Sequence, residues 1–177
     1  MSPLASTRPK TRNENMKEFN NLEESGRRNE LYRLGCAHHE GLGVPRSFEL
    51  ACRYFSEAAT LGCADSMRML GYLFRDGANK DLEKAKHWWS SAAMSGCAIS
   101  QAELFNLYAS GYFGLNEPQI VEAFAWGNIA ACQKEAQTVS WSGWMASFRA
   151  FEAKMSAAQV RLGEARSVQL FAKIQSS

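Results

Sequence analysis

Histidine and cysteine are the residues of this chain that could bind a metal ion, and they are few. The 177 residues include three histidines, at 38, 39 and 87, and five cysteines. Cys36 and His39 would share one side of a helix, but they supply two ligands where a structural zinc site needs about four. The zinc spacings C-x₂-C, H-x₃₋₅-H and H-E-x-x-H are all absent from the sequence. We therefore predict no metal site and no cofactor.

The serines and glycines also lack the spacings of catalytic motifs. Neither Ser-x-x-Lys nor Gly-x-Ser-x-Gly occurs in the sequence, so no nucleophile can be assigned. The run from Gly41 to Gly43 follows a predicted helix instead of opening one, which argues against a phosphate-binding loop. We expect non-covalent recognition from this chain, and we predict that it is not an enzyme.

Composition limits the class of partner. A net charge of +2 is too small for a dedicated nucleic-acid binder. No stretch approaches 18 apolar residues, so no membrane span is predicted. Residues 1–13 contain two prolines and a cluster of basic groups but no apolar run of a signal peptide. They predict a disordered basic tail and a cytoplasmic location.

Three alanine pairs divide the rest of the chain into units. Ala58-Ala59, Ala92-Ala93 and Ala130-Ala131 recur at intervals of 34 and 38 positions. A period of roughly 20–50 residues indicates a small structural unit stacked on copies of itself. Other positions repeat in register: Leu34-Gly35 with Leu70-Gly71 and Leu104-Phe105, and Tyr54-Phe55 with Trp88-Trp89 and Trp126-Gly127.

Each unit is predicted to contain two helices. Gly41, Gly77 and Gly111 stand where the first helix should end, because glycine adopts the left-handed conformation at little steric cost. Ser47, Asp81 and Asn116 are predicted to cap the second helix. The fold class is therefore an all-α solenoid of about three helix-turn-helix repeats with capping helices at both ends.

The ends of the chain differ from the repeats. Residues 14–25 predict a separate helix that Gly26 ends, a half repeat held by Phe19 and Leu22. Apolar residues from Trp141 to Met155 recur at steps of three and four, and a capping box at residues 156–159 starts a last helix. The predicted boundaries are 1–13 for the tail, 14–27 for the N-terminal cap, 28–137 for three repeats and 138–177 for the C-terminal capping helices.

These motifs resemble the Sel1-like repeat family, which is related to tetratricopeptide repeats. The segment from Glu83 to Gly96, with its basic-alanine, paired-aromatic and paired-alanine positions, is the best match. Phe105 and Gly127 depart from the pattern in the third unit. The resemblance implies a bacterial protein-protein interaction module that acts as an adaptor, scaffold or inhibitor, with toxin neutralisation (an immunity protein) as its most specific version. It also leaves open a hydrolase-like activity on β-lactam or cell-wall substrates, ascribed to some cysteine-rich relatives, although no residue here supports one.

The resemblance also bears on the cysteines and on the binding face. Cysteine-rich secreted relatives pair cysteines at the positions of Cys36 and Cys52, but the second unit has Tyr72 and Lys86 there, so free thiols are expected. In tetratricopeptide-like solenoids the first helix of each unit lines the concave face. The partner-binding residues predicted there are Tyr32, His39, Glu40, Arg68, Tyr72, Arg75, Asp76 and Asn106.

The sequence also allows two alternatives to a partner-binding face. The same polar residues could form an ordinary solvated face, because every surface helix needs a polar side. Alternatively, Trp141 and Trp144 could cover a neighbouring chain, which would make the protein a self-assembling homodimer.

Overall fold

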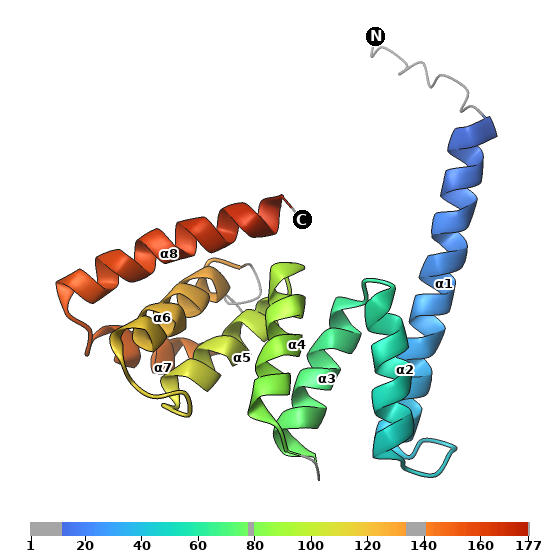
Figure 1. Ribbon diagram of the computed structural model, residues 1–177, viewed down its shortest axis with the longest axis horizontal. Helices are drawn as coiled ribbons and strands as arrows, with labels where there is room; N and C mark the ends of the chain where they lie inside the picture. The colour runs from blue at the N-terminus through green and yellow to red at the C-terminus, as the bar shows by residue number, and fades with distance from the viewer. Residues whose placement is uncertain (1–11, 78–79, 134–140, 177) are drawn as a thin grey trace.

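The computed structural model describes residues 12–77, 80–133 and 141–176, which form eight α-helices and no strand (Figure 1). The helices are α1 (Arg12–Glu40), α2 (Phe48–Thr60), α3 (Ala64–Asp76), α4 (Leu82–Met94), α5 (Ala98–Ala109), α6 (Glu117–Ala131), α7 (Ser142–Glu152) and α8 (Ala157–Gln175). The predicted all-α fold is confirmed. The predicted tail falls mostly on residues 1–11, which lie outside the described residues, and the boundary at 137 also lies outside them.

Helices α1 to α6 form three antiparallel pairs that follow one another across the molecule (Figure 1). Within each pair the two helices pack closely, and α2–α3 and α4–α5 contacts join consecutive pairs. Ser47, Asp81 and Asn116 each cap a second helix, and each side chain accepts a hydrogen bond from a backbone N–H of the first turn. The predicted caps are therefore confirmed.

The predicted helix break at Gly26 is wrong. Helix α1 runs without interruption from Arg12 to Glu40, and Gly26 lies inside it. The residues on both sides of Gly26 are mostly good helix formers, and one glycine costs about 1 kcal/mol, which a long helix tolerates. The first half of α1 projects away from the other helices (Figure 1). Leu22 is 67% exposed there, so it does not supply the predicted packing contact.

The glycines that end the first helices act in two different ways. Gly41 and Gly111 have φ values of 79° and 76°, in the left-handed region predicted for them. Gly77 instead has φ of −73°, so its role is steric. A Cβ atom at Gly77 would overlap the Leu73 carbonyl oxygen and lie 2.7 Å from the Phe48 ring. Glycine is needed here because the Leu73 carbonyl oxygen and the Phe48 ring both occupy the place of a Cβ atom.

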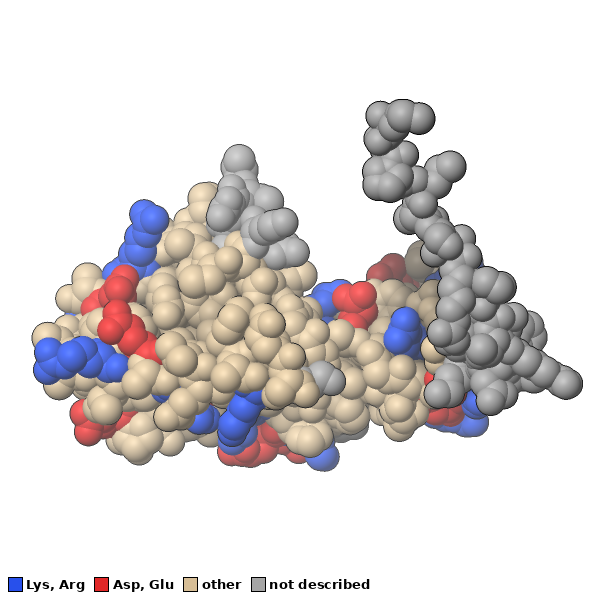
Figure 2. All heavy atoms as spheres, turned by 90° about the horizontal axis from the view of Figure 1, so that it is seen from above, with Lys and Arg blue, Asp and Glu red and all other residues tan. Residues whose placement is uncertain are grey.

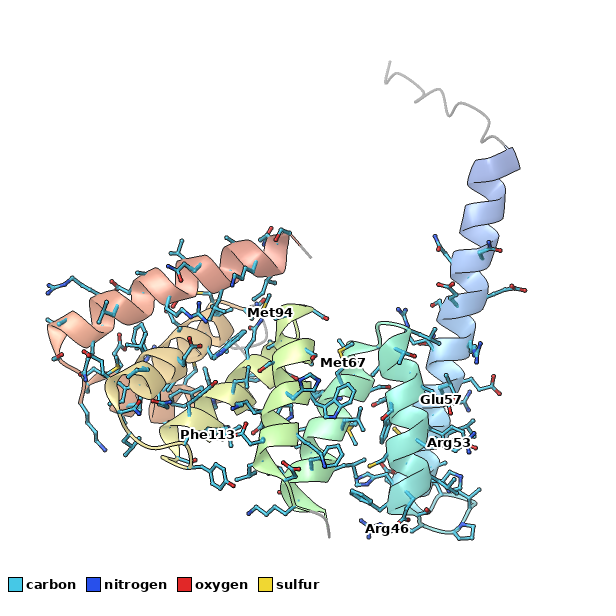
Figure 3. All side chains as sticks on the ribbon, viewed as in Figure 1. Arg46, Arg53, Glu57, Met67, Met94 and Phe113 are labelled. Atoms are coloured by element: carbon cyan, nitrogen blue, oxygen red, sulfur yellow. The ribbon has the colours of Figure 1, made fainter. Side chains whose placement is uncertain are left out.

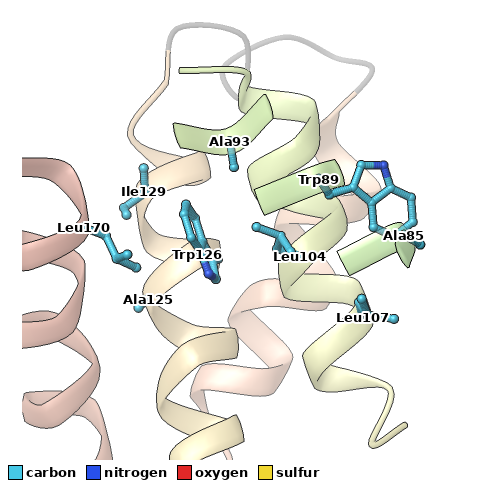
Figure 4. Close-up of a cluster of buried hydrophobic side chains, with 9 residues drawn as sticks. All are labelled: Ala85, Trp89, Ala93, Leu104, Leu107, Ala125, Trp126, Ile129 and Leu170. Carbon is cyan, nitrogen blue, oxygen red and sulfur yellow. The ribbon is translucent and has the colours of Figure 1, made fainter. Parts of the chain in front are cut away.

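The alanine pairs lie in the core, as their spacing predicts, except that Ala131 of the third pair is only partly buried. Ala58, Ala92, Ala93 and Ala130 are fully buried, and Trp89 is 1% exposed. Small side chains let neighbouring helices approach closely, and the large rings fill the remaining space. Figure 4 shows this arrangement in the core between α4, α5, α6 and α8.

The last two helices close the stack. The capping box at Ser156 and Gln159 is formed and begins α8, which packs along α6. On α7, Trp144 and Phe148 pack against Phe105 of α5, with ring centroids 5.6 and 5.4 Å from it. Trp144 therefore covers its own chain, which argues against the predicted use of this ring to cover a neighbour.

Candidate functional site

Glu103 links the second and third units on the face formed by their first helices. Its Oε1 accepts a hydrogen bond of 3.0 Å from the Tyr72 hydroxyl, and its Oε2 accepts one of 3.0 Å from Arg75 Nη1. Asn106 Nδ2 also donates to Oε2 at 3.5 Å. A carboxylate can accept bonds on both oxygens, so this one side chain orders three neighbours. Glu103 is not among the partner-binding residues predicted from the sequence.

Arg75 is held from several sides. Its Nε and Nη2 donate to the two carboxylate oxygens of Asp76 at 2.8 and 2.7 Å, in the bidentate geometry that guanidinium groups favour. The guanidinium also lies 4.9 Å from the ring centroid of Tyr72 and 5.5 Å from that of Trp89. The hydrogen bond from Arg75 lowers the pKa of Asp76 and keeps this carboxylate ionised.

Tyr72 and Arg68 continue the same cluster toward the start of α3. Burial raises the pKa of Tyr72 to about 12, with a further contribution from the Glu103 carboxylate. Arg68 forms an ion pair of 3.0 Å with Asp65 and lies 5.9 Å from the Tyr72 ring centroid. The Arg68 side chain is only 17% exposed, so most of it is packing surface.

Tyr32 and Glu40, both on α1, stand apart from this cluster. The Tyr32 ring packs against Phe55 at 5.8 Å, and burial raises the pKa of Tyr32 to about 12. Tyr32 thus belongs mainly to the core of the first unit. Glu40 is exposed at the last position of α1.

His39 lies in a cleft between the α1–α2 loop and the end of α3. The cleft has a volume of about 520 Å³. Its lining consists of His38, His39, Arg46, Phe48, Tyr72, Leu73, Asp76 and Gly77. We call it the loop cleft. Three of the predicted residues, His39, Tyr72 and Asp76, therefore meet at one concave site, together with the unpredicted residues Arg46 and Phe48.

A second, smaller cleft lies on the other side of Glu103. It has a volume of about 260 Å³, and its lining consists of Ile99, Ala102, Glu103, Asn106, Trp141 and Trp144. We call it the tryptophan cleft. The Trp141 and Trp144 rings meet edge to face at 5.3 Å, and Ile99 is 41% exposed. An exposed apolar residue and half-buried rings beside a polar cluster are features found in protein interfaces.

The structure thus brings together most of the predicted site residues. Arg68, Tyr72, Arg75, Asp76 and Asn106 form one connected group, and His39 borders it. Glu103 escaped prediction because the matching position in the second unit is Met69, so no repeat pattern marks it. Its position three residues before Asn106, on the same helix face, is the one feature of the sequence that could have indicated it.

Several other features of the described part of the chain concern metal ligands, cysteines, membrane spans and surface charge. No group of three or more His, Cys, Asp or Glu residues is placed there to hold a metal ion. All five cysteines are free. Among the described helices none has the length and apolarity of a membrane span. On the face that Figure 2 shows, the acidic and basic side chains of the described residues form small mixed groups without a continuous basic area.

Comparison with solved structures shows the same fold in another protein. The chain is similar to a Sel1 repeat protein from Oxalobacter formigenes, with a TM-score of 0.60 and 21% identity. This match covers 89% of the chain but 64% of the longer Oxalobacter protein. A protective antigen of uropathogenic Escherichia coli with an SLR fold, c5321, matches at 19% identity over 86% of this chain and 47% of its own. Its TM-score of 0.43 adds nothing to the fold assignment.

The sequence profile of the Sel1 repeat provides the assignment of the family. It matches residues 31–63, 64–97 and 98–135, which together make up more than half of the chain. A search of curated proteins finds no match. Each profile match covers one helix pair, although the first begins inside α1, and the third includes the unit in which Phe105 and Gly127 depart from the usual pattern. The chain therefore belongs to the Sel1 repeat family.

Proposed function

We propose that this protein binds a protein partner through the face formed by the first helices of its units, which we call the groove face. Sel1 repeat proteins are generally protein-protein interaction modules and typically not enzymes. The observation that carries the proposal is the position of the loop cleft and the tryptophan cleft on the two sides of the Tyr72–Arg75–Glu103 network.

The network supports binding because it is ordered before any partner arrives. Tyr72, Arg75 and Glu103 hold one another by hydrogen bonds and ring contacts, so they lose little freedom when a partner covers them. Tyrosine, tryptophan and arginine also dominate the binding energy of many interfaces. The groove face supplies tyrosine and arginine, and the adjoining start of α7 supplies Trp141 and Trp144.

The more specific role we propose is that of a cytoplasmic adaptor or inhibitor, with neutralisation of a cognate toxin as its narrowest form. Five free cysteines support a reducing compartment. A preordered groove supports tight one-to-one binding, which an inhibitor requires. The toxin-neutralising version further predicts that the partner is toxic when it is produced without this protein.

The test is capture of the partner from a lysate of the native cell by the full chain, compared among surface variants. Ile99→Arg and Asn106→Arg change exposed residues of the tryptophan cleft and should reduce capture at least about tenfold, since a misplaced charge in an interface costs more than about 1.4 kcal/mol. Arg53→Gln is the matched control on α2, where the side chain is 71% exposed and paired with Glu57 (Figure 3).

The proposal requires that the groove variants retain the far-UV circular dichroism of the original chain while they lose the partner. A captured protein that is lost with Arg53→Gln, or that is retained by both groove variants, would show that the binding face lies elsewhere.

A further inference from the structure

The loop cleft has features that specify the chemistry of what it binds. The chain reverses between α1 and α2 in a loop closed by a 2.9 Å hydrogen bond from Ser47 N to the His38 carbonyl. Gly41 and Gly43, with φ values of 79° and 72°, make this sharp return possible. The loop thereby sets Arg46 and Phe48 opposite the end of α3. Figure 3 labels Arg46 at this end of α2.

The floor of the cleft is apolar. Phe48 and Leu73 form it, and the surface of the cleft is more apolar than polar. The Phe48 ring is fixed by an edge contact of 6.3 Å with Phe74 and by the space that Gly77 leaves for it. A volume of about 520 Å³ admits one or two side chains of a partner. Such a floor favours an apolar side chain over a purely polar ligand.

Arg46 gives the rim of the cleft a positive charge that has no ionic partner among the described residues. Arg46 is exposed, and neither Arg46 nor His39 makes an ion pair or hydrogen bond to any described residue. His38 is oriented by a 3.2 Å contact between Nδ1 and the Pro45 carbonyl oxygen. The acidic residue of the lining, Asp76, is already paired with Arg75 through two hydrogen bonds.

We propose that the loop cleft binds an apolar side chain that stands next to an aspartate or glutamate in the partner protein. This inference rests on the proposed function and specifies the partner segment for one end of the groove face. The apolar side chain packs on Phe48 and Leu73, while the neighbouring carboxylate accepts hydrogen bonds from Arg46 and His39. A nucleic-acid phosphate would use the same hydrogen-bond donors, Arg46 and His39, but leave the apolar floor without a partner, so the acidic peptide fits better.

Short peptides test this inference without knowledge of the partner. The probes are three capped pentapeptides, Gly-Phe-Glu-Gly-Gly, Gly-Phe-Gln-Gly-Gly and Gly-Gly-Glu-Gly-Gly, titrated into the ¹⁵N-labelled full chain. The first should shift the amide signals of residues 38–48 and 72–77 at millimolar concentration. Each of the other two should bind about fivefold more weakly, because each lacks one of the two interactions.

Variants of the rim provide the second arm of the test. Arg46→Gln and His39→Gln should each weaken the first peptide by about fivefold and leave the glutamine peptide unchanged. Arg53→Gln, the control on α2, should have no effect. The inference is wrong if the glutamine peptide binds as well as the glutamate peptide, if no shifts localise to the cleft, or if a single-stranded oligonucleotide binds there more tightly than the peptide.

Failure of this inference can be separated from failure of the proposed function. If Arg46→Gln still captures the partner while Asn106→Arg does not, and the peptides do not bind, the groove face binds a partner that does not use the loop cleft. If peptide binding follows the expected pattern, the loop cleft is a recognition site in its own right.

Discussion

Phe105 on α5 and Gly127 on α6 exchange the roles that an aromatic ring and a glycine have in the two earlier units. In those units a glycine of the first helix faces a ring of the second helix, and a Cβ atom at the glycine would overlap that ring. The pairs are Gly35 with Phe55 and Gly71 with Trp89. In the third unit the glycine lies on the second helix, and a Cβ at Gly127 would lie 3.1 Å from Phe105.

The exchange connects the last repeat to the C-terminal cap. Phe105 is 3% exposed, and its ring meets Trp144, Phe148 and Phe151 of α7 nearly perpendicularly at 5.4 to 5.6 Å. Phe148 also fills the space beside Gly127, where its ring would lie 2.5 Å from an added Cβ atom. The third unit thus keeps the close helix approach of the others while it presents a ring to the cap.

Phe105→Ala should lower the free energy of unfolding by about 3–5 kcal/mol, because it removes a buried ring that touches three others. The change should also loosen α7 and expose Trp144, which would shift the summed fluorescence of the five tryptophans toward longer wavelength before global unfolding. Urea denaturation followed by fluorescence and by circular dichroism measures both effects. Phe171→Ala, at a ring that is 47% exposed, serves as the control and should cost much less.

Gly71→Ala should destabilise the second unit by roughly 1–3 kcal/mol, because the added methyl group overlaps the Trp89 ring in a filled core. The effect is measured by urea denaturation. Gly143→Ala is a control within α7, where an added Cβ meets nothing within 4 Å. Equal stability of the Gly71 variant and the original chain would contradict the close approach of α3 and α4.

Gly26→Ala tests the continuous helix α1. An added Cβ meets nothing within 4 Å and the backbone is helical, so alanine should stabilise this part of the helix by roughly 0.5–1 kcal/mol. Hydrogen exchange of the amides of residues 22–30 should slow accordingly. Faster exchange in the alanine variant would indicate that Gly26 adopts the left-handed conformation of a helix end after all.

Glu103→Gln should weaken the connection between the second and third units by about 1–3 kcal/mol, because the amide cannot replace the charge that Arg75 and Tyr72 bind. A double-mutant cycle with Tyr72→Phe should give a coupling energy of about 0.5–3 kcal/mol. The readout is the free energy of unfolding in urea. Additive effects of the two changes would show that the Tyr72 hydroxyl gains nothing from the negative charge of Glu103.

Alkaline pH should destabilise the protein through its buried tyrosines. The pKa values of Tyr32 and Tyr72 are about 12 in the folded chain against 10.0 for the free group, so the unfolded chain loses their protons first. This contribution to stability is complete below about pH 10 and declines as pH rises toward 12. Urea denaturation between pH 9 and 11.5 should show a shallower decline in Tyr72→Phe than in the original chain. An identical decline would contradict the burial of Tyr72.

Local sequence was sufficient to predict the repeat and most of its helix ends. The caps at Ser47, Asp81 and Asn116 and the capping box at Ser156 act within one helical turn, so their effect can be read from a few neighbouring residues. The buried alanine pairs followed from their period because every unit packs in the same way. The same reasoning wrongly predicted a helix end at Gly26, because a glycine ends a helix in some contexts and is tolerated within one in others.

Tertiary structure alone decided the form of the groove face. The Tyr72–Glu103 bond joins residues 31 positions apart, and its formation depends on how the second and third units are stacked. The loop cleft likewise depends on the path of the α1–α2 loop against α3, which places Arg46 and Phe48 beside Leu73. A repeat pattern specifies what the units have in common, whereas Glu103, Arg46 and Phe48 differ between units. Only the packing of one unit against the next could place Glu103 beside Tyr72, and Arg46 and Phe48 beside Leu73.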